Sequence, residues 1–439
     1  MSETLIENGQ TETELPSPPG QPTWAAGLRR EALGLYRALP IPSQETEEWR
    51  YTDLSGLDLD AFVPLAAGQV SENLDGVAEG VQEAAGEIGE RAGLLVQHNS
   101  ETATVHLAPE DANRGVIFLG LDRAVAEHSE LVEKRLHGLV PADRTKFSAL
   151  HAALRTGGVF LFVPAGVRVE LPLQSLTYVD ADGLAVFPHT VIVAEEGADV
   201  TLIERYVSPA LERALSDAVT EIFVGPGARV RYVSLQDWGH GMTHLSVQRA
   251  VLDRDAELRS LAVAFGGSLS RTEVESVLSA PGGHSEMLGV YFTDAAQHFD
   301  HRSLQDHVAP HCGSEVLYKG ALKGRSRAVY SGWVHVRKDA QKTDAFQTNR
   351  NIVLSDEAKA DSIPNLEIEA NDVRCGHAAS VGPVDEDVRF YMQSRGIPAE
   401  EAERLIVTGF FQEVLDRVPL LEVRETLEQA IEDELELSE

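Results

Sequence analysis

The sequence has very little cysteine. Cys312 and Cys375 are the only two cysteines among 439 residues. Two thiols exclude a disulfide framework and are typical of a protein that works in a reducing cytosol. Two are also too few to hold a four-thiolate metal cluster within one chain.

Basic charge and long apolar runs are also scarce. The chain has 37 Lys and Arg against 70 Asp and Glu, a formal net charge of −33. This balance argues against nucleic acid or an anionic membrane surface as a partner. No apolar run approaches the roughly 20 residues of a membrane helix. The first eight residues, Met-Ser-Glu-Thr-Leu-Ile-Glu-Asn, lack the basic head and apolar core of a signal peptide. We therefore predict a cytoplasmic protein with no membrane partner.

Familiar catalytic motifs are missing as well. Residues 320–326, Gly-Ala-Leu-Lys-Gly-Arg-Ser, lack the Gly-Lys-Ser/Thr ending that binds phosphate in nucleotide-binding loops. The chain has no Gly-x-Ser-x-Gly nucleophile elbow and no His-Glu-x-x-His helix. We predict that the protein is not an enzyme and that the purified chain does not hydrolyse ATP.

Composition divides the chain into four parts. Residues 1–22 are rich in Glu, Thr and Pro and are predicted to be a disordered tail. Residues 23–157 form a predicted N-terminal mixed helical domain, which begins with an amphipathic helix over 24–39 and ends at a pair of glycines. Residues 158–384 show strand patterns with little helical periodicity. Residues 385–439 return to helical patterns and form a predicted C-terminal helical domain.

A loose repeat runs through the strand-rich part. In each unit a small or turn residue precedes a polar–apolar pair, and subtracting successive start positions gives 31, 30, 28, 28 and 30 residues. A period of this length, with one supersecondary unit per repeat, predicts a solenoid. The units start at Gly166, Gly197, Gly227, Asp255, Gly283 and Gly313.

The strands between the repeat starts alternate polar and apolar residues. This alternation suits a coil of strands with one face inside and one in water. We therefore predict a mainly β fold, in which a right-handed parallel β-helix core is flanked by N-terminal and C-terminal helical domains. The right-handed sense follows because parallel crossovers are overwhelmingly right-handed. A β-sandwich or stacked cupin barrels would also give many short strands and stay open as alternatives.

The predicted C-terminal helices carry a broad apolar stripe. Pro398 suits a first-turn position, and acidic residues follow it at the positive end of a helix. One interpretation is that the two helices pack on each other. The other is that two short helices cannot hide two adjacent phenylalanines, so that the stripe docks a partner. The residues predicted to dock a partner are Leu405, Ile406, Phe410 and Phe411.

Residues 364–382 hold the most informative stretch. Its first half alternates like a strand, and it then places Cys375 and His377 two residues apart. If the strand continues, both side chains leave the same face. A thiol and an imidazole side by side can bind zinc or iron. The structural alternative is a buried cysteine beside a hydrogen-bonded histidine.

Two other polar stretches favour structural roles. Five of the fifteen histidines fall between residues 284 and 311, but alternate positions of a strand diverge in direction, so that we expect them to serve the fold. Residues 328–351 are rich in amides inside the strand region. We expect them to form stacked side-chain hydrogen bonds along the solenoid, with an interface as the alternative.

Several long motifs resemble the SufB/SufD family of iron–sulfur cluster assembly proteins. They occur in the family's order, and the resemblance covers roughly residues 143–420. The segment Glu-Glu-Trp-Arg-Tyr-Thr-Asp at 47–53 is similar to the SufD branch. The other motifs are Tyr-Lys-Gly-Ala-Leu-Lys-Gly-Arg-Ser-Arg at 318–327, the stretch from 335 to 351, Leu-Glu-Ile at 366–368, Cys-Gly-His-Ala-Ala-Ser-Val-Gly at 375–382, and Phe-Tyr-Met-Gln-Ser-Arg-Gly-Ile at 390–397 followed by Phe410 and Phe411.

The chain also departs from SufB-type members. Where these place a cysteine ten residues before the equivalent of His377, this chain has Glu367. Where they flank that histidine with acidic residues, it has Gly376 and Ala378. These differences also favour the SufD branch.

The resemblance implies a scaffold subunit of the SUF system. It implies a β-helix core that pairs with a SufB-like paralogue, and C-terminal helices that bind a SufC-like ABC ATPase. Cys375 and His377 would face the SufB-like partner and share iron or a nascent iron–sulfur cluster with it, none being bound tightly by this chain alone. A homodimer is a further expectation for the isolated chain. The alternatives are a stand-alone SufB-type scaffold and, from another class, a β-helix enzyme acting on polysaccharide.

Overall fold

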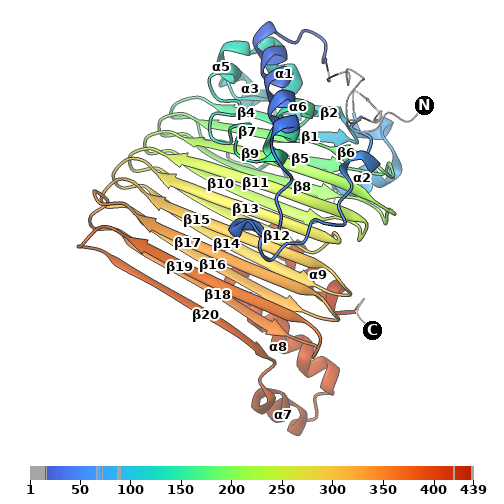
Figure 1. Ribbon diagram of the computed structural model, residues 1–439, viewed down its shortest axis with the longest axis vertical. Coiled ribbons are helices and arrows are strands. Elements are labelled where there is room, and N and C mark those ends of the chain that lie inside the picture. The colour runs from blue at the N-terminus through green and yellow to red at the C-terminus, as the bar shows by residue number, and fades with distance from the viewer. Residues whose placement is uncertain are drawn as a thin grey trace.

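The structure is a computed structural model that describes residues 15, 17–65, 68, 70, 71, 73–86, 90–418 and 421–436. Most of the predicted tail at residues 1–22 lies outside this description. The remainder is dominated by one elongated stack of strands with helices near both of its ends (Figure 1). Within the described residues, no helix is long and apolar enough to cross a membrane.

The strands form two long sheets, which confirms the predicted parallel β-helix core. Along most of the stack, each coil adds one strand to sheet 1 and one to sheet 2. Among the described strands, only the pairs β1–β2 and β3–β4 are antiparallel. In order across sheet 1 the strands are β2 (Glu101–Leu107), β1 (Gly93–His98), β5 (Leu173–Tyr178), β8 (Asp199–Val207), β10 (Arg229–Asp237), β12 (Glu257–Ala264), β14 (His284–Thr293), β16 (Gly313–Leu322), β18 (Asp344–Val353) and β20 (Arg374–Pro383).

Sheet 2 follows the same progression along the stack. At its N-terminal end the short strand β3 pairs antiparallel with β4, so the N-terminal region contributes strands to both sheets. In order across sheet 2 the strands are β19 (Lys359–Ile368), β17 (Arg327–Val336), β15 (His298–His307), β13 (Leu269–Leu278), β11 (Met242–Leu252), β9 (Ala214–Val224), β7 (His189–Ala194), β4 (Val159–Val163) and β3 (Ile117–Gly120), with β6 (Ala185–Val186) beside β9.

The sequence repeat marks the turns that lead into the strands of sheet 1. Gly197 and Gly227 adopt positive φ angles of 67° and 63° immediately before β8 and β10. Glycine suits this left-handed conformation because it has no Cβ to clash with the backbone. At the corresponding turns of later coils Asp255 and His311 adopt it at 56° and 60°. Gly282 keeps glycine in this conformation before β14, at 81°, so the turn geometry persists whether or not glycine occupies the position.

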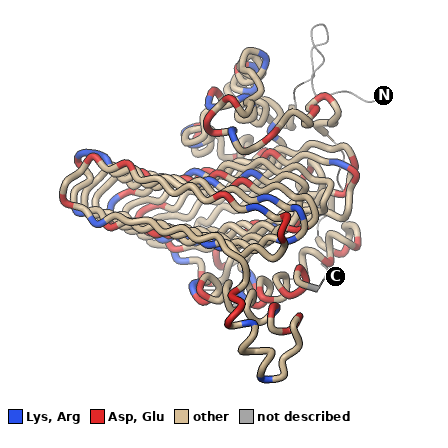
Figure 2. The backbone as a smooth tube through the Cα atoms, turned by 60° about the horizontal axis from the view of Figure 1, so that its bottom comes forward, with Lys and Arg blue, Asp and Glu red and all other residues tan. Residues whose placement is uncertain are grey.

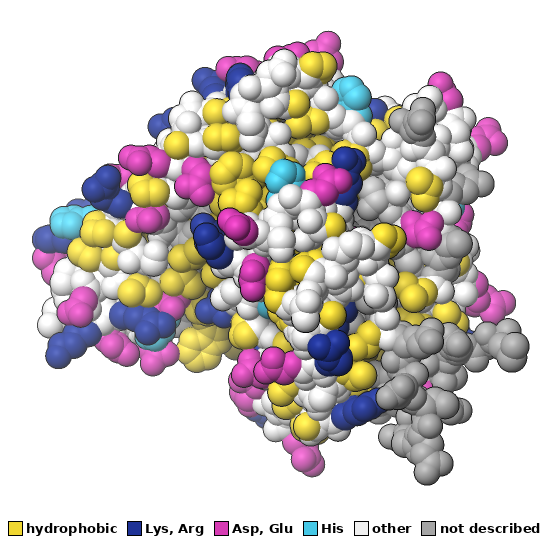
Figure 3. All heavy atoms as spheres, turned by 90° about the horizontal axis from the view of Figure 1, so that it is seen from above, with side chains coloured by type: hydrophobic (Ala, Val, Ile, Leu, Met, Phe, Trp, Pro, Cys, Tyr) yellow, Lys and Arg dark blue, Asp and Glu magenta, His cyan; other side chains and the backbone are white. Residues whose placement is uncertain are grey.

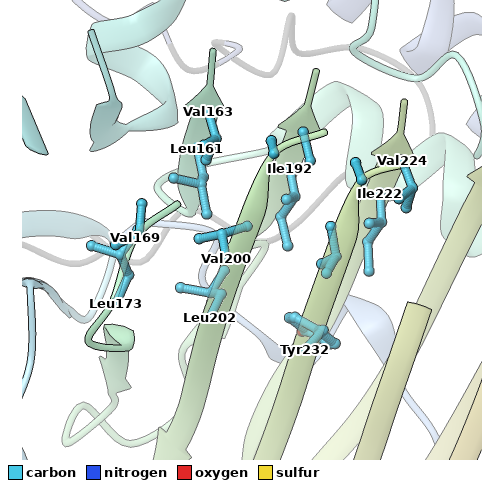
Figure 4. Close-up of a cluster of buried hydrophobic side chains, with 14 of the residues drawn as sticks. Leu161, Val163, Val169, Leu173, Ile192, Val200, Leu202, Ile222, Val224 and Tyr232 are labelled. Atoms are coloured by element: carbon cyan, nitrogen blue, oxygen red, sulfur yellow. The ribbon is translucent and has the colours of Figure 1, made fainter. Parts of the chain in front are cut away.

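Aliphatic side chains fill the narrow interior between the sheets in the first half of the stack. Leu161, Ile192 and Val200 are each buried, at 0% exposure, and belong to one continuous cluster. Figure 4 shows side chains of successive strands stacked in rows along the coils. Burying a side chain of this size contributes about 1.5–3 kcal/mol, and each coil repeats the contribution. Because each further coil adds a strand to both sheets, successive coils of the backbone lie one on another, and the core continues along the stack (Figure 2).

The helices lie at the two ends and along one side of the stack. Figure 3 views the N-terminal end from above, where hydrophobic, acidic and basic side chains are interspersed. The helical segments are α1 (Thr23–Ala38), η1 (Glu47–Trp49), η2 (Leu59–Ala61), η3 (Leu74–Gly76), α2 (Glu79–Gly86), α3 (Pro109–Asn113), α4 (Leu121–Glu127), α5 (Ser129–Glu133), α6 (Lys146–Leu154), α7 (Glu386–Ser394), α8 (Ala399–Leu415) and α9 (Leu421–Glu436).

A segment at residues 40–63, here called the strap, runs down the outer face of sheet 2 (Figure 1). Trp49 of the strap is buried, and its ring lies 3.9 Å from the guanidinium carbon of Arg271 on β13. The Thr52 hydroxyl donates a hydrogen bond to Asp300 on β15 over 2.6 Å. The strap therefore ties the N-terminal helices to the middle of the stack.

The C-terminal helices α8 and α9 pack on the outer face of sheet 1. Their buried side chains, such as Phe411 and Leu427, share a cluster with Leu288 and Leu317 of the sheet. Lys319 of β16 holds the helix, because its ammonium donates to the Phe410 carbonyl over 2.7 Å and lies 2.6 Å from the Glu413 carboxylate. The chain thus returns along its own sheet after the last coil.

Candidate functional site

The last coil leaves an unpaired edge on both sheets. β20 is the final strand of sheet 1 and β19 the final strand of sheet 2, and no further described strand pairs with either. Inward positions are buried in earlier coils, but most are half-buried or exposed in these two strands. The interior of the solenoid therefore meets solvent here, at what we call the open end.

Cys375 and His377 lie on β20 at the open end. In the parallel register with β18, Cys375 is opposite Ala345 and His377 is opposite Gln347. Ala345 and Gln347 point inward and are 0% and 1% exposed. Neighbouring residues in register share a face of a sheet, so both candidate ligands belong to the inner face. Cys375 is half-buried and His377 is exposed.

The surroundings of Cys375 favour the neutral thiol. Its pKa is raised, first by burial and second by the negative charge of Asp344 on the neighbouring strand. The side chain packs against a small apolar cluster that includes Val334 and Val336. A thiolate is the form that binds metal. Cys375 must therefore lose its proton as a metal binds, and no positive charge among the described residues lowers its pKa beforehand.

Gln347 lies one coil below His377 in the same inward column. Its Oε1 and Nε2 atoms are both buried, and neither has a hydrogen-bond partner among the described residues. A buried amide without partners loses its hydration without compensation. The inner column beneath His377 therefore offers a donor and an acceptor to a ligand or water held at the open end.

The amide-rich stretch at residues 328–351 forms the stacked hydrogen bonds expected from the sequence. Asn351 Nδ2 donates to Asn349 Oδ1 over 2.8 Å, and the Ser362 hydroxyl donates to the same oxygen over 2.6 Å. The Tyr291 hydroxyl donates to Asn351 Oδ1 over 2.5 Å. This network adds buried polar groups to the second half of the interior, beside an apolar cluster that includes Phe299 and Val316.

Of the five histidines between residues 284 and 311, two lie inside the coils, whereas His284 and His311 are exposed and His298 is half-buried. His301 and His307 are buried inside the coils, and His301 stacks on Tyr291 with 4.5 Å between ring centres. His307 Nε2 lies 2.8 Å from the Ser314 hydroxyl. The other cysteine, Cys312, is 1% exposed, and its thiol donates to the Ala280 carbonyl. It is therefore a structural residue in a turn.

One group of metal-ligand types was missed by sequence reasoning. In the described part of the chain, the ligand atoms of His335, Glu367 and Glu369 lie within 4.8 Å of one another. His335 and Glu367 are register neighbours on β17 and β19. Their separation of 32 residues is close to one period of the repeat. That period could have identified them as neighbours, had it been extended past residue 313.

The four predicted docking residues of α8 lie at different depths. Leu405 is 39% exposed and Ile406 is half-buried, whereas Phe411 is 0% exposed. Phe410 is half-buried, with the Lys319 ammonium 4.7 Å from its ring centre. Phe411 is fully covered and Phe410 partly covered because α8 packs on sheet 1, a neighbour that helical patterns alone do not reveal. Phe411 thus anchors the helix from within.

The preceding helix, α7, presents aromatic side chains to solvent instead. Phe390 is 72% exposed and Tyr391 is 58% exposed, with Val388 beside them at 43%. α7 extends beyond the stack at the lower end of Figure 1. Apolar side chains gathered on one exposed helix are typical of an interaction surface.

Comparisons with known proteins agree with this architecture. The family profile described as "SUF system FeS cluster assembly, SufBD core domain" matches residues 177–410, and that of the "SufBD protein N-terminal region" matches residues 87–175. The iron–sulfur cluster assembly protein SufD of Bacillus subtilis is 31% identical over 418 residues, which cover 94% of each chain. A SufBD family protein of Mycobacterium leprae is 38% identical over 314 residues, covering 69% of this chain and 78% of the relative. The chain therefore belongs to the SufB/SufD family of iron–sulfur cluster assembly proteins.

Proposed function

We propose that this chain is a non-catalytic scaffold subunit that pairs with a SufB-like paralogue in the cytoplasm and shares a site for iron or a nascent cluster with it. The observation that carries the proposal is the position of Cys375 and His377 on the inner face of an unpaired edge strand. At the equivalent inward positions of earlier coils the side chains are buried by the next coil, whereas here they reach the surface.

The open end has the form of half an interface. Unpaired strand edges present backbone donors and acceptors that invite another strand, and β19 and β20 present them side by side. A paralogue built from coils of the same cross-section could continue both sheets and cover the interior. A second copy of this chain could cover the same edges when the paralogue is absent, which is our expectation for the isolated chain.

Cys375 and His377 fit iron or a cluster as cargo that is shared with a partner. They supply one sulfur and one nitrogen ligand, both of which suit iron. A cluster bound by cysteine thiolates needs about four ligands, and the second cysteine of this chain is buried in a turn. The partner would therefore complete the ligand set, and the isolated chain would hold the cargo only weakly.

The first test measures iron in the assembled complex. The chain is co-expressed with SufB-like and SufC-like partners, and iron per complex is compared between the wild type and His377→Ala. Loss of a metal ligand is expected to weaken retention by about tenfold or more, since even outer-shell partners contribute tenfold to hundredfold. Ser380→Ala, an exposed position of the same strand, is the control. Equal iron in His377→Ala and wild type, with the complex intact, would show that the shared site is elsewhere.

We further propose that the SufC-like ATPase docks at the C-terminal helices. Leu405 and Ile406 lie at the surface of α8, and the exposed aromatic residues of α7 precede them. The chain has no phosphate-binding loop of its own, so that energy input would come from this partner.

The proposed docking surface is tested by replacing two of its exposed apolar side chains with aspartate. The double variant Phe390→Asp and Leu405→Asp is expected to raise the Kd for the ATPase by about 700-fold, because interface anchors contribute about 2 kcal/mol each and therefore about 4 kcal/mol together. Leu131→Asp, a half-exposed leucine of α5 at the other end of the molecule, is the control. The measurement is titration of the ATPase against the immobilised chain. An unchanged Kd in the double variant would show that the ATPase docks at another surface of the chain.

A further inference from the structure

A second cluster of ligand types lies on the outer face of sheet 2, next to the open end. His335 on β17 and Glu367 on β19 are neighbours in the parallel register. Glu369 follows two residues later, on the same side of the chain. The His335 Nε2 atom is 3.5 Å from the Glu369 carboxylate, and the ligand atoms of all three residues lie within 4.8 Å of one another.

Arginines neutralise most other carboxylates on this face, but not these two. Arg144 pairs with Glu273 and Glu275, and Arg337 donates two hydrogen bonds, of 2.8 and 2.7 Å, to Asp306. The pKa of Arg337 is raised first by its hydrogen bonds to Asp306, and the negative charge of Glu369 is a smaller cause. Arg337 donates no hydrogen bond to Glu369 within the described residues.

Within the described residues, Glu367 has no hydrogen bond or ion pair. Among the same residues the buried His335 Nε2 atom has no hydrogen-bond partner, and the Nδ1 atom lies 3.7 Å from the Asp306 carboxylate, which Arg337 already holds. Two carboxylates and an imidazole are thus held together without a cation among them.

The cluster opens into a hollow of about 300 Å³ on the outer face of sheet 2. Trp333, His335 and Glu367 line the side toward the open end. The rest of the lining includes Glu48 of the strap and three arginines that pair with the carboxylates of Glu273, Glu275 and Asp300, namely Arg144, Arg271 and Arg302. A hollow of this size holds several water molecules. A bound ion could therefore complete its coordination with water, which three protein ligands leave room for.

We propose that His335, Glu367 and Glu369 bind one divalent first-row transition-metal ion. Imidazole and carboxylate ligands together suit ions such as Fe²⁺, Mn²⁺ and Zn²⁺. Three protein ligands leave coordination positions of the ion open, in contrast to structural metal sites, which four protein ligands close. We therefore expect the bound ion to be exchangeable.

The position of this cluster suggests what it is for. β19 ends at Ile368 and β20 begins at Arg374, so Glu369 and Cys375 stand on either side of one turn. The outer cluster on sheet 2 and the inner pair Cys375 and His377 on sheet 1 are therefore joined by the turn between the last two strands of the stack. We assign it the role of collecting Fe²⁺ at the outside of the open end. This choice of ion rests on the proposed function, whereas metal binding by the cluster does not.

The test uses the purified full chain without partners and Co²⁺ as the probe. Visible absorption of bound Co²⁺ reports nitrogen and oxygen ligands, and a thiolate ligand adds a charge-transfer band in the near ultraviolet. We expect Co²⁺ to bind with the visible bands and without the thiolate band. Glu367→Gln together with Glu369→Gln is expected to raise the Kd at least about tenfold. Glu357→Gln, an exposed glutamate of the turn before β19, is expected to leave it unchanged.

A second pair of substitutions separates the two sites. Cys375→Ala with His377→Ala should leave Co²⁺ binding by the isolated chain unchanged. The inference is overturned if the Kd is the same in the glutamine variant and the wild type, or if binding is lost in the Cys375 and His377 variant. Matching thermal unfolding curves show that each variant is folded. The proposed function can fail independently, since it is measured as iron in the His377→Ala complex.

Discussion

Replacing Asp300 with alanine is expected to lower the free energy of unfolding by about 3–5 kcal/mol, because breaking a buried ion pair leaves an uncompensated charge. Asp300 is 0% exposed and accepts hydrogen bonds from Arg271, Arg302 and Thr52. Arg271 is itself only 2% exposed. Without Asp300 the Arg271 guanidinium keeps only the Glu273 carboxylate as an ion-pair partner among the described residues, and the strap loses the hydrogen bond from Thr52. Urea denaturation followed by circular dichroism measures the change.

The same column of sheet 2 provides a matched control. Asp300 is in register with Val329, and Val329 with Asp361. Asp361 pairs with Arg327 over 2.8 Å, but the two side chains are 42% and 40% exposed. Exposed pairs contribute about 0–1 kcal/mol, so Asp361→Ala should change stability little. If the two alanine variants were equally stable, the strap and its buried ion pairs would not be a main support of the stack.

The sequence predicts the solenoid fold of this protein well, because the residues that form each coil lie within one repeat of the sequence. A turn about every 30 residues and an alternating strand between turns are both visible in one repeat, as at Gly197 and Gly227. The parallel stacking follows, since each repeat can bury its apolar face only against the next. Two of the later turns are harder to recognise, because Asp255 and His311 take the conformation that glycine takes at Gly197, Gly227 and Gly282.

Contacts between distant segments account for what the sequence does not predict. The packing of Phe411 on Leu288 and Leu317 joins residues about a hundred positions apart, and no helical pattern states which face of the solenoid a helix will cover. Alternation predicts that Cys375 and His377 share a face. It does not tell the inner face from the outer one, which only the register with Ala345 and Gln347 decides.

Acid is expected to destabilise this protein steeply below about pH 6.5, because several histidines are buried in their neutral form. Burial lowers the pKa of His137 and His244 to about 3, and of His301 and His307 to about 4. His151 and His189 are fully buried, and their pKa values are also lowered, first by burial; for His151 the charge of His189 is the next cause, and for His189 that of Arg155. His151 Nε2 lies 3.0 Å from His189 Nδ1, and His189 Nε2 lies 2.9 Å from Glu221.

The sign follows from which state binds protons first. The unfolded histidines titrate near pH 6.5, and the folded ones only at lower pH. Above pH 6.5 neither state is protonated, so that stability is complete. As the pH falls through 6.5, the unfolded state takes up protons alone, and each buried histidine removes up to about 1.4 kcal/mol per pH unit until its folded pKa is reached. The raised pKa values of the buried carboxyl groups of Glu204, Asp217 and Glu221 act in the opposite sense, because there the folded state holds the proton.

A single substitution isolates the contribution of one histidine. His244 is 2% exposed and lies between the rings of Tyr206 and Trp238, with ring centres 5.5 and 6.1 Å away. Phenylalanine suits this aromatic environment and does not titrate. Between pH 6 and pH 4.5, His244→Phe is therefore expected to reduce the slope of unfolding free energy against pH by about 1.4 kcal/mol per unit. Urea denaturation at a series of pH values measures the slope. A slope equal to that of the wild type would mean that His244 is protonated in the folded protein, and that the buried histidines do not set its acid limit.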